Sequence, residues 1–216
     1  MPLPTFDDVL AAAARIAPHA HATPVLRSRA LDALAACQPH FKAEPLQRTG
    51  AFKFRGACNA VWALDDATAA RGVVTHSSGN HGAALALAAR TRRIACHVVV
   101  PEGANAAKLA NIVRYGAQLH TCAATIAARE TTAAQVEADT GATLIHPYTH
   151  PHVIAGQGTA ALELLNAQGP LDVVVAPVGG GGLLGGTAIA PAATAPGCRI
   201  VGAEPGALPP VMGWTA

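Results

Sequence analysis

The fold is decided by residues 72–91, whose sequence is GVVTHSSGNHGAALALAART. The short β-branched run Gly72–His76 predicts a strand, and the small polar residues after it predict a turn. An alanine-rich stretch over 80–91 then predicts a helix. The same strand–turn–helix unit recurs towards the C-terminus at similar spacing. Such alternation indicates an α/β fold, with parallel strands joined by right-handed crossovers.

The other segments of this pattern follow from apolar runs and alanine-rich stretches. Further strands are predicted at Ile94–Val100, Gln118–Cys122, Thr143–His146, Asp172–Val178 and Arg199–Ala203. Further helices are predicted at 105–115, 125–138, 152–167 and 183–193. The strands are mostly continuous apolar runs, which is typical of strands covered by helices on both faces of a sheet.

The first 70 residues are less regular. Helices are predicted at Phe6–Ile16, Leu31–Ala36 and Phe52–Leu64, and a strand is predicted at His40–Glu44. No low-complexity linker and no internal repeat is visible in the sequence.

The amino-acid composition limits which classes of protein this chain can belong to. Apolar residues make up 51% of the 216 residues and charged residues 13%, a balance that fits a compact soluble globule. Aromatic residues at 4% and a net charge of +2 argue against nucleic-acid binding. The N-terminus lacks the pattern of a secretory signal, and no uninterrupted apolar run reaches transmembrane length. We therefore expect a cytoplasmic protein without a membrane segment.

Cysteine and histidine are present without the spacing of a metal site. The five cysteines are Cys37, Cys58, Cys96, Cys122 and Cys198. Their odd number and the lack of a C-x-x-C pair argue against a disulfide framework and a cysteine zinc site. The ten histidines include no H-E-x-x-H motif. Buried, reduced cysteines and no metal are expected.

The first of three chemically informative motifs is LQRTGAFKFRGA at 46–57. It places Lys53 at the predicted start of a helix, between Phe52 and Phe54. Apolar neighbours favour a neutral, nucleophilic amine, which a Schiff base requires. Taken alone, the motif fits an ordinary solvated lysine at a helix start better than a nucleophilic one, since most lysines are solvated.

The second motif is Thr75–Gly82, where a strand leads through Ser77 and Ser78 into a helix that starts near Asn80. A helix N-terminus offers free N–H groups to an anion. Ordinary N-capping needs only one such polar residue, so several together favour a carboxylate or phosphate site.

The third motif is VVVAPVGGGGLLGGT at 173–187. Four consecutive glycines between a buried strand and a helix allow close approach of N–H groups to an anion. The alternatives are a flexible turn and a dinucleotide site, since residues 180–185 satisfy G-x-G-x-x-G and Glu204 follows 19 residues after Gly185. The dinucleotide interpretation leaves Lys53 and the Ser77–Gly82 turn without a role.

Together and in this order, the three motifs resemble fold-type II pyridoxal-phosphate (PLP) enzymes, most closely the serine/threonine dehydratase and serine racemase family. The stretch Pro151–Thr159 and the opening Thr23–Leu26 are also similar to that family. The resemblance covers essentially the whole chain. It implies two domains, a large one formed by 1–71 with 150–216 and a small mobile one at 72–149.

The resemblance also implies residue roles. Lys53 would carry PLP, Asn80 would bind its phenolic oxygen, and Gly179–Gly182, followed by Leu183, would hold its phosphate. The substrate carboxylate would be framed by Ser77, Ser78, Asn80 and His81. A homodimer and an amino-acid substrate are further implications.

The implied reaction is conversion of L-serine, L-threonine or a similar hydroxy-amino acid to a 2-keto acid and ammonia, with Lys53 as the base. A racemase would add Ser78 on the opposite face. A 3-hydroxyaspartate dehydratase would need a second cation, for which Arg129 is our candidate. The sequence does not separate these activities.

Three departures from the family pattern matter. Ala51 stands where many members have serine, and Pro210 stands where an acidic residue would follow Glu204, so a divalent cation is not expected. Family members also continue well past Ala216. The later part normally supplies more of the large domain and a Ser, Thr or Cys at the pyridine nitrogen. An alternative of another class is therefore an inactive remnant of the fold, recognisable by an exposed apolar surface.

Overall fold

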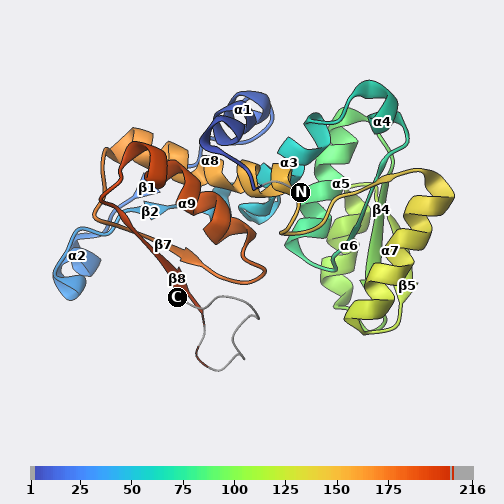
Figure 1. Ribbon diagram of the computed structural model, residues 1–216. Helices are drawn as coiled ribbons and strands as arrows, with labels where there is room; N and C mark the ends of the chain where they lie inside the picture. The colour runs from blue at the N-terminus through green and yellow to red at the C-terminus, as the bar shows by residue number, and fades with distance from the viewer. Residues whose placement is uncertain (1–2, 205, 207–216) are drawn as a thin grey trace.

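The computed structural model describes residues 3–204 and 206. Figure 1 shows two lobes side by side, joined through α3 and the segment that leads into α8. The helices are α1 (Phe6–Ile16), α2 (Arg29–Ala35), α3 (Lys53–Trp62), α4 (Asp66–Ala70), α5 (Asn80–Arg92), α6 (Ala106–Arg114), α7 (Ile126–Thr140), α8 (Pro151–Gln168) and α9 (Gly182–Thr194). The strands are β1 (Val25–Leu26), β2 (Phe41–Lys42), β3 (Val73–His76), β4 (Cys96–Pro101), β5 (Gln118–Cys122), β6 (Thr143–Leu144), β7 (Val173–Pro177) and β8 (Arg199–Ala203). Two 3₁₀ turns, η1 (Glu44–Leu46) and η2 (Arg48–Gly50), precede α3.

One lobe is built on a parallel four-stranded sheet in the order β5-β4-β3-β6. Successive side chains along each strand point to opposite faces of the sheet, so they pack into two separate cores. Val73 and Val98 pack with α5 and with Ile112 of α6, whereas Val74 and Val99 pack with α7. Helices therefore cover both faces, which explains the continuous apolar runs in the sequence. We call this part the four-stranded lobe.

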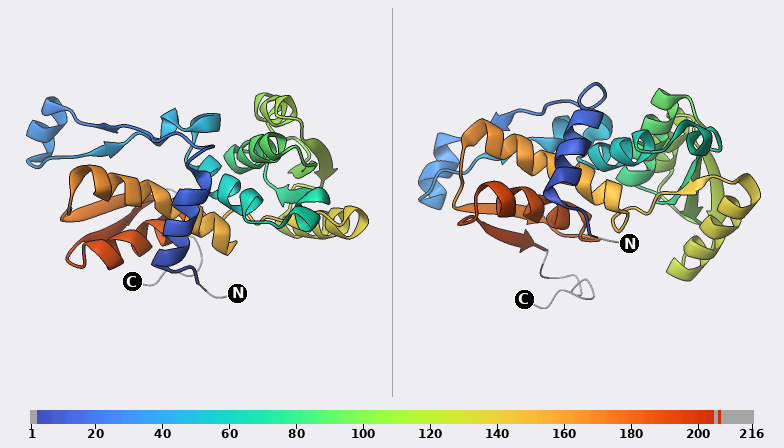
Figure 2. Two further views of the ribbon diagram at one scale, coloured as in Figure 1. Left: turned by 90° about the horizontal axis from the view of Figure 1, so that it is seen from above. Right: turned by 45° about the horizontal axis from the view of Figure 1, so that its top comes forward.

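The second lobe is centred on α8 and α9, with α1 packed on α8. Figure 2 shows its two small sheets on either side of these helices. These sheets are the parallel pair β7–β8 and the antiparallel pair β1–β2. We call this part the α8–α9 lobe.

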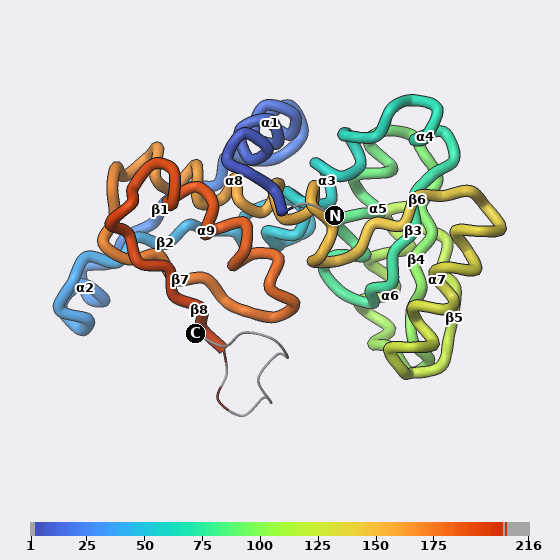
Figure 3. Tube along the Cα trace, viewed as in Figure 1, coloured from blue at the N-terminus to red at the C-terminus, as the bar shows by residue number. Residues whose placement is uncertain are grey.

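Glycines let the helices that carry the three motifs approach closely. A Cβ on Gly156 of α8 would lie 2.6 Å from the Cα of Gly56 in α3. A Cβ on Gly186 of α9 would lie 2.3 Å from the carbonyl oxygen of Ile154 in α8. Such distances exclude any side chain, so α3, α8 and α9 pack backbone against backbone. The tube in Figure 3 shows α3 near the middle of the molecule, with α8 and α9 in contact in the α8–α9 lobe.

The α/β fold predicted from the sequence is confirmed, and most predicted elements lie within two residues of their observed bounds. The prediction of a strand over His40–Glu44 is wrong beyond Lys42, because Pro45 lacks the N–H that a strand needs and a 3₁₀ turn begins at Glu44. The short elements β1 and α4 were not predicted. No helix among the described residues is long and apolar enough to cross a bilayer.

Candidate active site

Lys53 begins α3 and is mostly buried. Its Nζ donates a hydrogen bond to the carbonyl oxygen of Pro147 at 3.0 Å and lies 5.4 Å from the centroid of the Phe52 ring. Burial lowers the pKa of Lys53 to about 8. A sizeable fraction of the amine is therefore neutral near physiological pH, as nucleophilic attack on a carbonyl requires.

The glycine motif joins β7 to α9 and surrounds the same space as Lys53. Gly181, the residue before α9, has φ +83°, a conformation that favours glycine, and no side chain from the described residues caps this helix. A cavity of about 240 Å³ is lined by Phe52, Lys53, Pro177, Val178, Gly179, Gly180, Gly181, Gly182 and Leu183. The amine and a set of open backbone N–H groups thus face one cavity.

The turn after β3 supplies a second open helix N-terminus. Gly79 precedes α5, and no described side chain caps that helix either. Ser77 Oγ accepts only a 3.4 Å hydrogen bond from the N–H of Gly79. Ordinary capping therefore does not account for the polar residues here, which is compatible with anion binding.

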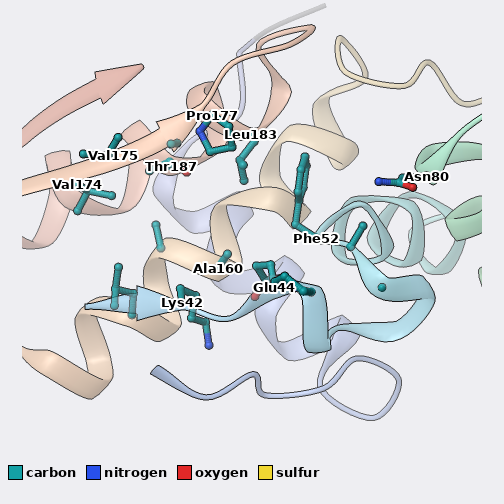
Figure 4. Close-up of a pocket in the computed structure, with 16 residues that line it drawn as sticks. Lys42, Glu44, Phe52, Asn80, Ala160, Val174, Val175, Pro177, Leu183 and Thr187 are labelled. Atoms are coloured by element: carbon teal, nitrogen blue, oxygen red, sulfur yellow. The ribbon is translucent and has the colours of Figure 1, made fainter. Parts of the chain in front are cut away.

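Asn80, the first residue of α5, lines a cavity beside the one that Lys53 lines. Together with Phe52 and Leu183 it lines a second cavity of about 370 Å³, next to the first (Figure 4). Ser77, Ser78 and His81 line neither cavity in the part of the chain that the structure describes. Lys53 and the glycine loop thus line one cavity and Asn80 lines its neighbour, with Phe52, Pro177 and Leu183 common to both. The roles of all the predicted site residues stay predictions.

His81 differs from the other predicted carboxylate-binding residues. The residue is 2% exposed, and its ring Nε2 lies 3.4 Å from the carbonyl oxygen of Ile145. Burial first, and the charge of Lys53 second, lower the pKa of His81 to about 3. The ring is neutral and faces the interior, so only the backbone N–H of His81 is suited to a substrate carboxylate.

Sequence reasoning missed the segment between β6 and α8. Pro147 accepts the hydrogen bond from Lys53, and a Cβ on Gly180 would lie 2.2 Å from Cγ of Tyr148. The ring of His146 packs edge-on against Tyr148 and His76. The available signal was an aromatic residue two positions after a predicted strand, at the carboxyl edge of a parallel sheet.

The described residues contain no cluster of three or more His, Cys, Asp or Glu side chains suited to a metal ion. Glu204 follows β8 and is exposed, and Pro210 lies outside the described residues. The expectation about a divalent cation therefore stays a prediction.

The family model for pyridoxal-phosphate dependent enzymes matches residues 16–215. The chain belongs to this family.

Among curated proteins, this PLP-family chain is 50% identical to a β-hydroxyaspartate dehydratase of Paracoccus denitrificans over 205 residues, which are 95% of the chain and 65% of the relative. It is 49% identical to a serine racemase of Oryza sativa subsp. indica, over 90% of the chain and 57% of that protein. The crystal structure of serine racemase from Dictyostelium discoideum superposes with a TM-score of 0.91 at 48% identity, over 94% of the chain and 66% of that structure. The fold-type II architecture predicted from the motifs is confirmed, and the chain spans less than two thirds of these relatives.

The residues present fit PLP. Lys53 offers a partly neutral amine, and the glycine loop offers uncapped N–H groups where a side chain at Gly180 has no room. An aldehyde and a phosphate are the two groups that such a pair of sites accepts. Lys53 would hold the aldehyde end, Gly179–Gly182 with Leu183 the phosphate, and Asn80 the ring. When bound, PLP supplies an electron sink for a carbanion at the substrate's Cα.

Proposed function

We propose that the chain carries the active site of an ammonia-lyase that converts a β-hydroxy-amino acid to a 2-keto acid and ammonia. The observation that carries the proposal is the single cavity shared by the Lys53 amine and the four-glycine loop. In the reaction, Lys53 Nζ takes the proton from Cα of the substrate, and the β-hydroxyl group leaves as water. The released enamine hydrolyses to the keto acid and ammonia.

Two features of the chain support this chemistry. The pKa of Lys53, lowered to about 8 by burial, lets the amine act as a base near neutral pH. The uncapped N-terminus of α5 provides N–H groups for the substrate carboxylate, with Ser77, Ser78 and Asn80 beside them. Ser78 would face the substrate from the side opposite Lys53.

A 3-hydroxyaspartate substrate is favoured by Arg129. The strands of the four-stranded sheet are parallel, so the first turn of α7 lies at the same edge as the turn that follows His76. The pKa of His76 is lowered mainly by burial, and the charges of Glu130 and Arg129 also act on it, which supports a position of Arg129 near the candidate site. Nε of Arg129 is buried without a partner among the described residues. The P. denitrificans relative carries the name β-hydroxyaspartate dehydratase.

The test supplies the chain with PLP and, separately, L-serine, L-threonine and L-threo-3-hydroxyaspartate, and measures 2-keto acid. Keto acid from the wild type and none from Lys53→Ala would support the lyase. Bound PLP with inverted amino acid and no keto acid would instead identify a racemase. Bound PLP with neither product would contradict both activities.

Arg129→Ala tests the choice of substrate. It should lower activity on hydroxyaspartate at least tenfold and leave serine within about twofold. Arg114→Ala, which removes an arginine from the C-terminal turn of α6, is the control. Equal activity of Arg129→Ala and wild type on hydroxyaspartate would remove Arg129 from the proposal.

We further propose the domain division 1–71 with 150–216 and 72–149. All four strands of the four-stranded sheet lie within the second range, which supports it. Limited proteolysis should release a fragment close to 72–149. Cleavage only within that range would contradict the division.

A further inference from the structure

Arg55 is the centre of a buried ionic network next to the candidate cofactor lysine. It lies two residues after Lys53 on α3, and its side chain is fully buried. Its Nε and Nη2 each donate to Glu44 at 2.8 Å. Its Nη1 and Nη2 donate to Glu163 at 2.6 and 2.9 Å. Two planar two-point pairs of this kind are specific to the guanidinium group.

Lys42 balances the charge of the network. Its Nζ lies 2.5 Å from Glu163 Oε2 and 2.6 Å from the carbonyl oxygen of Thr23. Burial acts to raise the pKa of Glu163, but hydrogen bonds from Arg55 and Lys42 outweigh it and leave that pKa below its ordinary range. Two cations thus meet two carboxylates. Arg55 is fully buried, and its three charged partners are partly exposed. Buried ion pairs contribute little net stability, which favours a role of the network in fixing geometry.

The network connects the two halves of the candidate site. Glu44 belongs to η1, which leads into the start of α3, and Glu163 belongs to α8. Helix α8 in turn packs on α9, where a Cβ on Gly158 would lie 2.8 Å from the carbonyl oxygen of Gly186. Helix α9 starts in the glycine loop. Figure 4 places Lys42 and Glu44 on the wall of the larger cavity, near Phe52.

We propose that Arg55 is a positioning residue for Lys53: by fixing the first turns of α3 between η1 and α8, it holds the amine at its buried place beside Pro147 and the glycine loop. Its importance for the cofactor rests on the proposed function, but the position of the amine can be measured without PLP.

The electrostatics of Lys53 support an effect of position. Burial alone accounts for the lowered pKa of Lys53. The titratable groups acting with it are His81 and His146, and burial is the largest cause of the lowered pKa of each, so both are neutral above about pH 7. If α3 loosens and water reaches Nζ, the pKa of Lys53 should move towards about 10, the value for an exposed lysine.

The experiment labels the 216-residue chain with trace acetic anhydride from about pH 6 to about pH 11, so that the neutral fraction of each amine is followed. Lys53 is quantified by mass spectrometry against the exposed Lys108. In the wild type, the midpoint for Lys53 should lie near 8. In Arg55→Met it should rise, and labelling at pH 7 should fall by about tenfold.

Arg92→Met is the matched control, because Arg92 holds the other end of α3. Its Nη1 donates to the carbonyl oxygens of Val61 and Leu64 at 2.5 and 2.8 Å. This variant should lose stability and keep the Lys53 midpoint near 8. Arg55→Lys preserves the positive charge but removes the planar guanidinium group and its paired hydrogen bonds. It therefore distinguishes an effect of geometry on the Lys53 midpoint from an effect of charge. It also provides the test if Arg55→Met does not fold. Its midpoint should rise as well.

A Lys53 midpoint that stays near 8 in folded Arg55→Met or in Arg55→Lys would overturn the positioning role. Because no PLP is present, a failure here differs from a failure of the proposed function, which would appear as a wild-type chain that does not bind PLP.

Discussion

The two lobes differ in how their parallel sheets are covered. In the four-stranded lobe, the neighbouring residues Val98 and Val99 point to opposite faces and both are fully buried. In the α8–α9 lobe, Val174 of β7 is 6% exposed, whereas Val175 is 61% exposed. Val201 of β8 is also exposed. One face of β7–β8 is therefore uncovered by the described residues, although parallel sheets are normally covered on both faces.

The two lobes therefore obtain their stability in different ways. The four-stranded lobe is held by a sheet with a core on each side. The α8–α9 lobe combines close helix contacts at glycines with a smaller apolar core that includes Val9, Leu162 and Leu165. The glycine loop belongs to the second lobe, and the α5 turn belongs to the first. Lys53 lies between them, and its amine donates a hydrogen bond to Pro147 in the segment that connects β6 to α8.

Disrupting the contact between α8 and α9 should cost the most stability. In Gly186→Ala, the added methyl group would meet the backbone of α8, so we expect a loss of about 3 kcal/mol or more in the free energy of unfolding. Gly185→Ala is the control, because its Cβ would meet only Ile154 Cγ2, at an ordinary 3.8 Å. Urea unfolding measures both. Equal stabilities would contradict a lobe held by backbone contact.

A core truncation tests the four-stranded lobe. Ile112 is fully buried between α6 and the sheet, and Ile112→Ala should cost about 3 kcal/mol through lost burial and an unfilled cavity. The neighbouring Val113 is 51% exposed, so Val113→Ala should cost less than about 0.5 kcal/mol. Similar losses for the two variants would mean that α6 does not pack on the sheet as described.

The stability of the chain should depend on pH through Lys53, which lies between the two lobes. Because burial lowers its pKa to about 8, the unfolded chain binds more protons than the folded chain between about pH 8 and 10. Wild-type stability should therefore rise with pH across that window. Lys53→Met should be more stable by about 2–3 kcal/mol at pH 7, and this gain should vanish above about pH 10. Lys108→Met serves as the control, and a gain that does not depend on pH would contradict the buried amine.

The smallest effect is expected at the uncovered face of β7–β8. Val175→Ser should change stability by less than about 0.5 kcal/mol and reduce binding of a hydrophobic dye. Val174→Ser, on the covered face, should be clearly destabilising. A large loss in Val175→Ser would show that this face is covered in solution, for example by a second copy of the chain.

The sequence predicted the four-stranded lobe well, because long apolar runs and alanine-rich helices carry a strong periodic signal. It also singled out Lys53 and the glycine loop, which the structure places on one cavity, whereas the role of Asn80 came from the family resemblance and stays a prediction. It did not predict β1, a strand of only two residues, or the partners of Arg55, since Glu163 is 108 residues away. The inward ring of His81 depends in the same way on a distant carbonyl group, that of Ile145.

If Lys53 and the glycine loop form a PLP site, covalent capture of the cofactor should occur on Lys53. The purified chain is mixed with PLP, its absorbance is recorded, and the adduct is reduced with borohydride and mapped by mass spectrometry. We predict a visible absorbance band and a reduced adduct on Lys53, absent from Lys53→Ala. No band, or an adduct spread over Lys42 and Lys108, would contradict the claim.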